Sequence, residues 1–193
     1  MRLRRVIHCL TANFDKELMM SEANFFGLFG LPIEFEIDKN ALKSALLSLQ
    51  KQHHPDRVDA NKTSTNQASL INHAYQILFH DDSRAAYMLE LSDQTVDLSQ
   101  SIDDWDFLDE MMDLRIRLDA TSDRSALDQI SSQVQALSKD QSTRFVQNYQ
   151  NQAWAEAMDA TRKLQFLGKL LVDVDAKVTD SLSQSNDDDD LYV

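Results

Sequence analysis

Glycine and proline are scarce in this chain, with 3 glycines and 2 prolines among 193 residues. Average usage would supply about 23 of these two residues together. A sheet protein with many tight turns depends on glycine and proline to make them. Hydrophobic residues nevertheless account for 42% of the chain, which is enough for a folded core. The sequence therefore predicts an all-α protein.

The charge balance excludes several broad functions. The chain has 32 acidic and 19 basic residues, and its formal net charge is −13. Such a molecule repels phosphate backbones and anionic lipid, so we expect neither a nucleic-acid nor a membrane partner. The single cysteine, Cys9, has no internal partner for a disulfide, which favours a reducing compartment.

Residues 1–19 differ from the rest of the chain. Three arginines lie near the start and Asp15 is the first acidic residue. The composition predicts a disordered N-terminal extension. Two alternatives stay open: an organelle-targeting peptide, or a start codon placed upstream of a true start at Met19 or Met20.

The next body, residues 20–92, carries a pattern of four helices. An aromatic-rich stretch at 24–31 predicts a short first helix. The second helix follows Asp38 as its cap and ends near His53, because Pro55 forces the residue before it out of helical geometry. Apolar residues at the spacing of one buried helical face mark the second and third helices: Ala41 or Leu42, Ala45, Leu46 and Leu49, then Ile71, Ala74, Tyr75 and Leu78.

The connections in this body are polar. The stretch from Arg57 to about Thr65 lacks apolar periodicity, which predicts an exposed loop. Asp81, Asp82 and Ser83 supply a cap for a short fourth helix from Arg84 to about Leu91.

The second half of the chain predicts a three-helix bundle. A polar segment at 93–102 is typical of a linker. Residues 103–183 then hold three long amphipathic helices, at about 103–119, 123–151 and 153–183. Residues 184–193 include four consecutive aspartates and predict a solvated, disordered acidic tail.

The tripeptide His54-Pro55-Asp56 lies between the second and third predicted helices. The tripeptide alone is weak evidence, since three given residue types meet by chance in roughly one chain of this length in a hundred. The charge around it is unusual. Five basic and two acidic residues between Lys39 and Lys62 give +3, which leaves −16 for the remainder of the chain. A cationic strip on an acidic molecule indicates docking on an anionic protein surface, although a merely solvated face stays open.

This arrangement resembles the J domain of DnaJ-type co-chaperones, in which the tripeptide lies between the second and third of four helices. Several further stretches, in the same order, are similar to the HscB family, the iron–sulfur assembly members of that class. They cover the chain from about 20 to 183: residues 24–32, 71–78, 84–91, 107–115 and 153–170. The resemblance implies an N-terminal J domain, a helical hairpin with short flanking helices, linked to a C-terminal three-helix bundle.

The first helix of the bundle has two apolar stripes. Phe107, Met111, Leu114 and Leu118 make the expected core face. Leu108, Met112 and Ile116 make another, turned by about 100°. A second stripe either broadens the core or marks a partner surface, and the sequence leaves both open. In the third helix, Phe166 and Leu170 likewise lie off the main stripe.

The resemblance implies two partners and no catalytic activity of the chain itself. The J domain would dock on an HscA-type chaperone of the DnaK class and trigger its ATP hydrolysis, and the bundle would bind the scaffold protein IscU. The implied chaperone-binding residues are His54, Pro55, Asp56, Lys39, Lys43, Lys51 and Arg57. The implied scaffold-binding residues are Leu108, Met112, Asp113, Arg115 and Phe166. The chain departs from the family at Asp109 and Ile116, where close relatives tend to have an apolar and an acidic residue.

The sequence also allows other interpretations. A J-domain adaptor for a different client is the main alternative. A hydrolase metal site from His53, His54, Asp56, His73 and His80 is disfavoured, because His73 and His80 lie about 10 Å apart along one helix. We expect no metal and no cofactor. The N-terminal zinc module of some HscB relatives needs a cysteine pair, which is absent. Trp105 and Trp154 are expected in the core or at the edge of the bundle. The net charge and the acidic tail are compatible with a bacterial cytoplasm, and a mitochondrial matrix stays open if the Arg-rich start is a targeting peptide.

Overall fold

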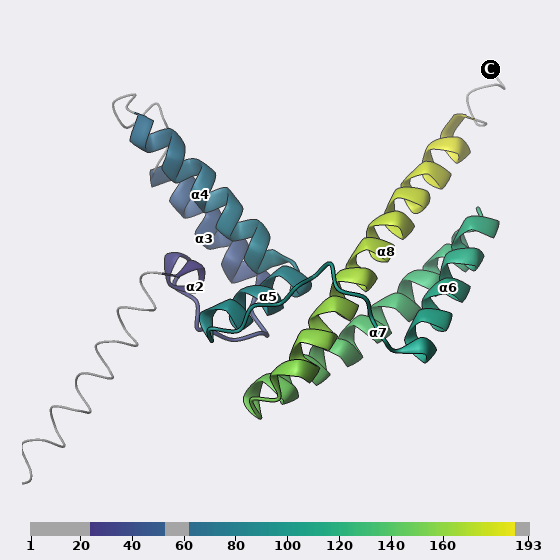
Figure 1. Ribbon diagram of the computed structural model, residues 1–193. Helices are drawn as coiled ribbons and strands as arrows, with labels where there is room; N and C mark the ends of the chain where they lie inside the picture. The colour runs from purple at the N-terminus through teal and green to yellow at the C-terminus, as the bar shows by residue number, and fades with distance from the viewer. Residues whose placement is uncertain (1–23, 53–61, 188–193) are drawn as a thin grey trace, which may run out of the picture. The chain divides into compact units, whose positions relative to one another are not determined.

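The protein is described by a computed structural model that covers residues 24–52 and 62–187 (Figure 1). Every regular element in these ranges is a helix, which confirms the all-α prediction. The chain forms two compact units, one ending at Arg84 and the other beginning at Ala85. Each unit is described by itself.

The first unit begins with the short helix α2, Phe25–Leu28. The Asn24 side chain caps it by accepting a hydrogen bond from the Gly27 amide at 3.0 Å. Gly30 then adopts a left-handed conformation, with φ of 65°, that a residue with a Cβ rarely adopts. The expected short aromatic helix is therefore present, and a single glycine turns the chain away from it.

Helices α3 and α4 make the main hairpin of this unit (Figure 1). Helix α3 spans Lys39–Gln52 and α4 spans Lys62–Phe79. The Asp38 carboxylate caps α3 by accepting from the amides of the second and third helical residues, Asn40 and Ala41, at 2.8 and 3.2 Å. Of the residues that the apolar spacing marks, four are buried and four are partly buried: Leu42, Ile71, Ala74 and Leu78, then Ala45, Leu46, Leu49 and Tyr75.

Two helices begin earlier than the sequence predicts. Helix α4 starts at Lys62 rather than beyond Thr65, because its polar first turn contains no glycine or proline to prevent helical geometry. Helix α5, Asp81–Leu91, includes Asp81 and Asp82 in its first turn instead of using them as a cap. Carboxylates at that position are favoured by the positive end of the helix dipole.

Arg84 ties the end of this unit together. Its side chain is 3% exposed. The guanidinium donates to the Phe35 carbonyl at 2.7 Å, to the Leu78 carbonyl at 2.6 Å and to the Asp81 carboxylate at 2.7 Å. It also lies 4.6 Å from the centre of the Phe35 ring. One buried cation therefore joins the loop before α3 to the end of α4 and the start of α5.

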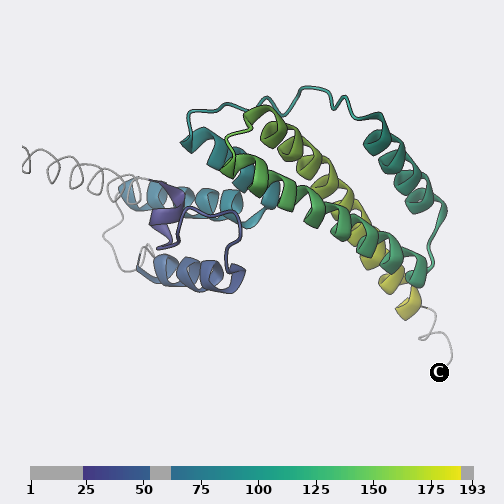
Figure 2. The same cartoon turned by 90° about the horizontal axis from the view of Figure 1, so that it is seen from below.

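The second unit contains α6 (Trp105–Ala120), α7 (Arg124–Gln150) and α8 (Trp154–Asp187). Figure 2 shows α7 and α8 side by side along much of their length. Helix α8 continues four residues beyond the expected end near 183, since no glycine or proline follows Gly168 to stop it. The predicted tail beyond Asp187 lies outside the described residues.

The predicted core stripes meet inside this bundle. Phe107, Met111, Leu114 and Leu118 of α6 are all buried. They form one cluster with residues of α7 and α8: Leu127, Ile130, Val134, Leu167, Leu170 and Val174. Leu170, which the sequence leaves off the main stripe of the third helix, is 2% exposed and belongs to this core.

Candidate functional site

Helix α3 carries the described part of the predicted chaperone-binding surface. Its lysines Lys39, Lys43 and Lys51 all lie on the exposed surface of the helix. Residues His54, Pro55, Asp56 and Arg57 fall outside the described ranges, so their part in the site stays a prediction.

Lys39 differs from the other two lysines because it is engaged within its own unit. Its ammonium lies 3.3 Å from the Asp81 carboxylate and 5.1 Å from the centre of the Phe79 ring. Lys43 and Leu47 lie one turn apart, Lys51 follows after another turn, and the side chain of Leu47 is 51% exposed. The face presented to solvent by α3 is thus a leucine between two lysines.

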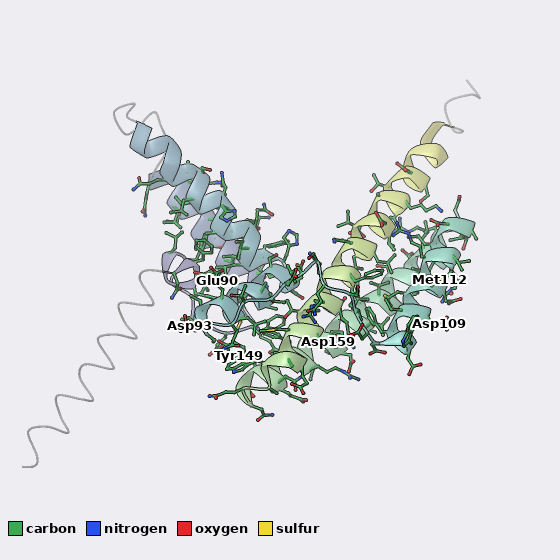
Figure 3. All side chains as sticks on the ribbon, in the orientation of Figure 1. Glu90, Asp93, Asp109, Met112, Tyr149 and Asp159 are labelled. Atoms are coloured by element: carbon green, nitrogen blue, oxygen red, sulfur yellow. The ribbon has the colours of Figure 1, made fainter. Side chains whose placement is uncertain are left out.

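The second stripe of α6 divides between the core and the surface. Leu108 is half-buried and packs against the core cluster. Met112 is 64% exposed and Ile116 is 57% exposed. In Figure 3, Asp109 and Met112 are labelled on this helix, and both are exposed. The structure therefore resolves the alternatives left by the sequence: the stripe broadens the core at Leu108 and forms surface beyond it.

An open groove of about 580 Å³ lies between α6 and α8. We call it the α6–α8 groove. Five of its eight lining side chains are apolar, and the two methionines among them make the wall adaptable. Four of the five predicted scaffold-binding residues line it, and Asp113 does not. The lining residues are Leu108, Met111, Met112, Arg115, Phe166, Lys169, Leu170 and Asp173.

Charged residues in and beside this groove lie on both helices. Arg115 forms an ion pair with Asp173, which joins α6 to α8 across the groove. Asp113 lies 3.5 Å from Arg117 on its own helix. Lys169 is exposed and forms no ion pair within the described ranges. Two of the predicted polar residues are therefore already paired within the protein.

The start of α6 is held in place by Asp104 and Lys163. Asp104 caps the helix by accepting from the Phe107 amide at 3.1 Å, and it accepts from the Lys163 ammonium at 2.6 Å. Lys163 also contacts Asp159 at 2.8 Å. Burial alone would lower the pKa of Lys163, but its hydrogen bonds to both carboxylates outweigh burial and raise the pKa above 10.5. The ammonium is thus charged at neutral pH and fixes α6 against α8.

Trp105 is where the sequence prediction is wrong. Its side chain is 82% exposed, in neither the core nor the edge of the bundle. It is the first residue of α6, where a side chain projects past the end of the packed core. Trp154, by contrast, is half-buried and meets the Tyr149 ring edge-on at 5.7 Å. Helical spacing could have revealed this exposure, because Trp105 lies seven residues before Met112 and therefore on the same side of α6.

Two further features of the described residues bear on function. The described ranges contain no group of three or more side chains able to hold a metal ion, and His73 and His80 are separate exposed residues. No helix among the described residues has the length and apolar character to cross a membrane.

Comparison with known proteins identifies both halves of the chain. The DnaJ domain model matches residues 25–87, and the model of the HSCB C-terminal oligomerisation domain matches residues 103–175. The co-chaperone protein HscB homolog of Acinetobacter baumannii strain ATCC 17978 is 40% identical over 87% of this chain and 97% of its own length. The chain belongs to the HscB family of co-chaperones. An HscB homolog of Vibrio atlanticus is 36% identical over 76% of this chain and 92% of its own length.

Solved HscB structures share this fold. Chaperone HscB from Vibrio cholerae has a TM-score of 0.69 and 36% identity, and the match covers 82% of this chain and 99% of that one. Human co-chaperone HscB has the same TM-score at 24% identity, covering 80% and 81% of the two chains, and supports the fold alone. The family thus confirms the J domain followed by a helical C-terminal domain. Its members are co-chaperones, and a J domain acts with a DnaK-type chaperone.

Proposed function

We propose that this HscB-family protein serves iron–sulfur cluster assembly by delivering the scaffold protein IscU to an HscA-type chaperone. The α6–α8 groove supports the client half of the proposal. It is an exposed apolar surface with Met112 and Phe166 at its rim, on a bundle whose core is already complete without them. Exposed apolar patches of this kind mark protein-binding sites.

The J domain supplies the other half of the proposed function. The cationic face of α3 steers the domain toward an anionic patch on the chaperone, with Lys43 and Lys51 as the charges that form no ion pair within the described ranges. His54, Pro55 and Asp56 would then trigger ATP hydrolysis in the chaperone. The proline restricts the backbone between the two polar side chains, which reduces the ordering cost of docking.

Carrying both surfaces on one chain couples the two events. A client bound to the bundle is held at high effective concentration near the chaperone that the J domain engages. Hydrolysis is then stimulated when the client is present. The protein itself contributes binding and positioning and no covalent chemistry, in a bacterial cytoplasm.

Steady-state ATP hydrolysis by an HscA-type chaperone tests the proposal. We expect stimulation by the intact protein, a further rise on adding IscU, and loss of stimulation in His54→Gln. Met112→Ser should keep the basal stimulation and lose the rise with IscU. Stimulation that ignores IscU would favour an adaptor for another client. Absence of stimulation by the intact protein would overturn the proposal.

A further inference from the structure

Trp105, Met112 and Ile116 form an apolar stripe along α6 that extends beyond the α6–α8 groove. Trp105, Met112 and Ile116 are separated by seven and four residues, so they lie within about 40° of one another around α6. Their exposed fractions are 82%, 64% and 57%. Leu108 lies on the flank of this stripe, where it enters the α6–α8 groove. The stripe is therefore continuous with the proposed client site.

Packing of the bundle core does not explain why the side chains of this stripe are apolar. The buried residues Phe107, Met111 and Leu114 lie on the opposite side of α6 and complete the packing of the bundle. A tryptophan left this exposed keeps a large apolar side chain in water without any gain for folding. Tryptophan is also the residue type most enriched among the anchors of protein interfaces.

Charged residues of opposite sign lie on the two sides of the stripe. On its side away from α8 lie the exposed aspartates Asp106 and Asp109, which form no ion pair with any described residue. On its α8 side lies Lys169, which lines the α6–α8 groove and a second groove of about 380 Å³ near Ile102. A complementary partner surface has an apolar centre. It carries a basic side chain that faces Asp106 and Asp109, and a carboxylate that faces Lys169.

We propose that Trp105 is an anchor for the same client, which lies along α6 from Trp105 to Ile116. The inference rests on the proposed function and adds this residue and the orientation to it. The span is about 17 Å. A stable interface buries about 800 Å² on each partner, so a client seated in the groove necessarily extends over neighbouring surface of this size. Continuity with the groove therefore selects one client rather than a second partner.

Tryptophan fluorescence measures this directly, because the chain contains two tryptophans. In the full-length Trp154→Phe variant, Trp105 is the single probe. The spectrum of IscU alone is subtracted. Binding of IscU should shift the Trp105 emission to shorter wavelength and protect it from acrylamide quenching. Isothermal titration with Trp105→Ala should give a dissociation constant at least tenfold weaker than that of the unsubstituted protein.

Matched variants separate the possible failures. Val172→Ser removes an apolar side chain that is 65% exposed on α8 and away from the stripe, and it should leave affinity unchanged. Asp109→Lys should slow association severalfold at low salt. If Met112→Ser abolishes binding while Trp105→Ala binds normally and shows no emission shift, this inference is overturned and the proposed function stands. If the unsubstituted protein does not bind IscU, both fail together.

Discussion

The Phe166 ring meets the Phe107 ring edge-on, with centroids 6.2 Å apart at an angle of 77°. Phe107 is 6% exposed and belongs to the bundle core, while Phe166 is 43% exposed at the groove. The Lys163 ammonium lies 5.5 Å from the centre of the same Phe107 ring. The apolar rim of the groove is thus supported by a buried residue, which limits the ordering cost when a client binds.

This pair predicts opposite outcomes for two truncations. Phe166→Ala should weaken IscU binding by about tenfold or more and change the free energy of unfolding by less than about 1 kcal/mol. Phe107→Ala should cost about 3–5 kcal/mol of stability, because it leaves a cavity in the core. Titration calorimetry and urea unfolding followed by circular dichroism measure the two effects. Equal losses of stability would contradict the division between rim and core.

The core of the bundle is predictable because helical period alone determines which residues share a face. Phe107, Met111, Leu114 and Leu118 follow that spacing, and all four are buried. The same argument finds the second stripe from Leu108 onward. It cannot decide between core and surface there, because that depends on how closely α8 approaches α6.

The sequence pattern does not predict which residues of different helices contact each other. Arg115 pairs with Asp173, 58 positions away, and Lys163 with Asp104, 59 positions away. Both depend on the register of α8 against α6, to which many charged residues could contribute. The prediction for Trp105 fails for another reason: tryptophan is usually buried, and the exposure of this residue departs from that tendency.

On the J domain, the three lysines of α3 should not contribute equally to docking. Lys39 is held by Asp81 and lies against the Phe79 ring, whereas Lys43 projects into solvent. Lys43→Ala should therefore reduce the association rate with the chaperone more than Lys39→Ala, and the difference should shrink at high salt. Stopped-flow binding at two ionic strengths measures this. A larger effect of Lys39→Ala would show that its internal pair opens on docking.

Arg84→Met should destabilise the first unit by about 3 kcal/mol. The change keeps an apolar stem but leaves the Phe35 and Leu78 carbonyls without their buried donor. Amide hydrogen exchange in α3 and α4, resolved by mass spectrometry, measures the loss. Tryptophan emission provides the control, because Trp105 and Trp154 both belong to the bundle and should not change. Unaltered exchange in α3 and α4 would contradict the role given to Arg84.

Asp81 gives the same unit a specific dependence on pH. Burial alone would raise the pKa of Asp81, but Arg84 and then Lys39 outweigh it and hold the pKa below its ordinary 3.8. A carboxyl whose pKa is lowered by folding contributes stability above its unfolded pKa and loses it as pH falls through the folded pKa. Asp81→Asn should thus be less stable than the unsubstituted protein at pH 7, and the two should converge as the pH falls through the lowered pKa of Asp81.

The difference at pH 7 should be below about 1 kcal/mol, because the Asp81 side chain is 38% exposed and its charge is screened by solvent. Hydrogen exchange of α3 and α4 in both proteins between pH 2.5 and pH 7 measures it, after correction for the intrinsic exchange rate at each pH. Asp82→Asn is the matched control, since Asp82 shares the first turn of α5 without an ion pair to a described residue. A gap between Asp81→Asn and the unsubstituted protein that persists unchanged at pH 2.5 would mean that the Asp81 amide disturbs packing, and that its charge is not the source of the stability.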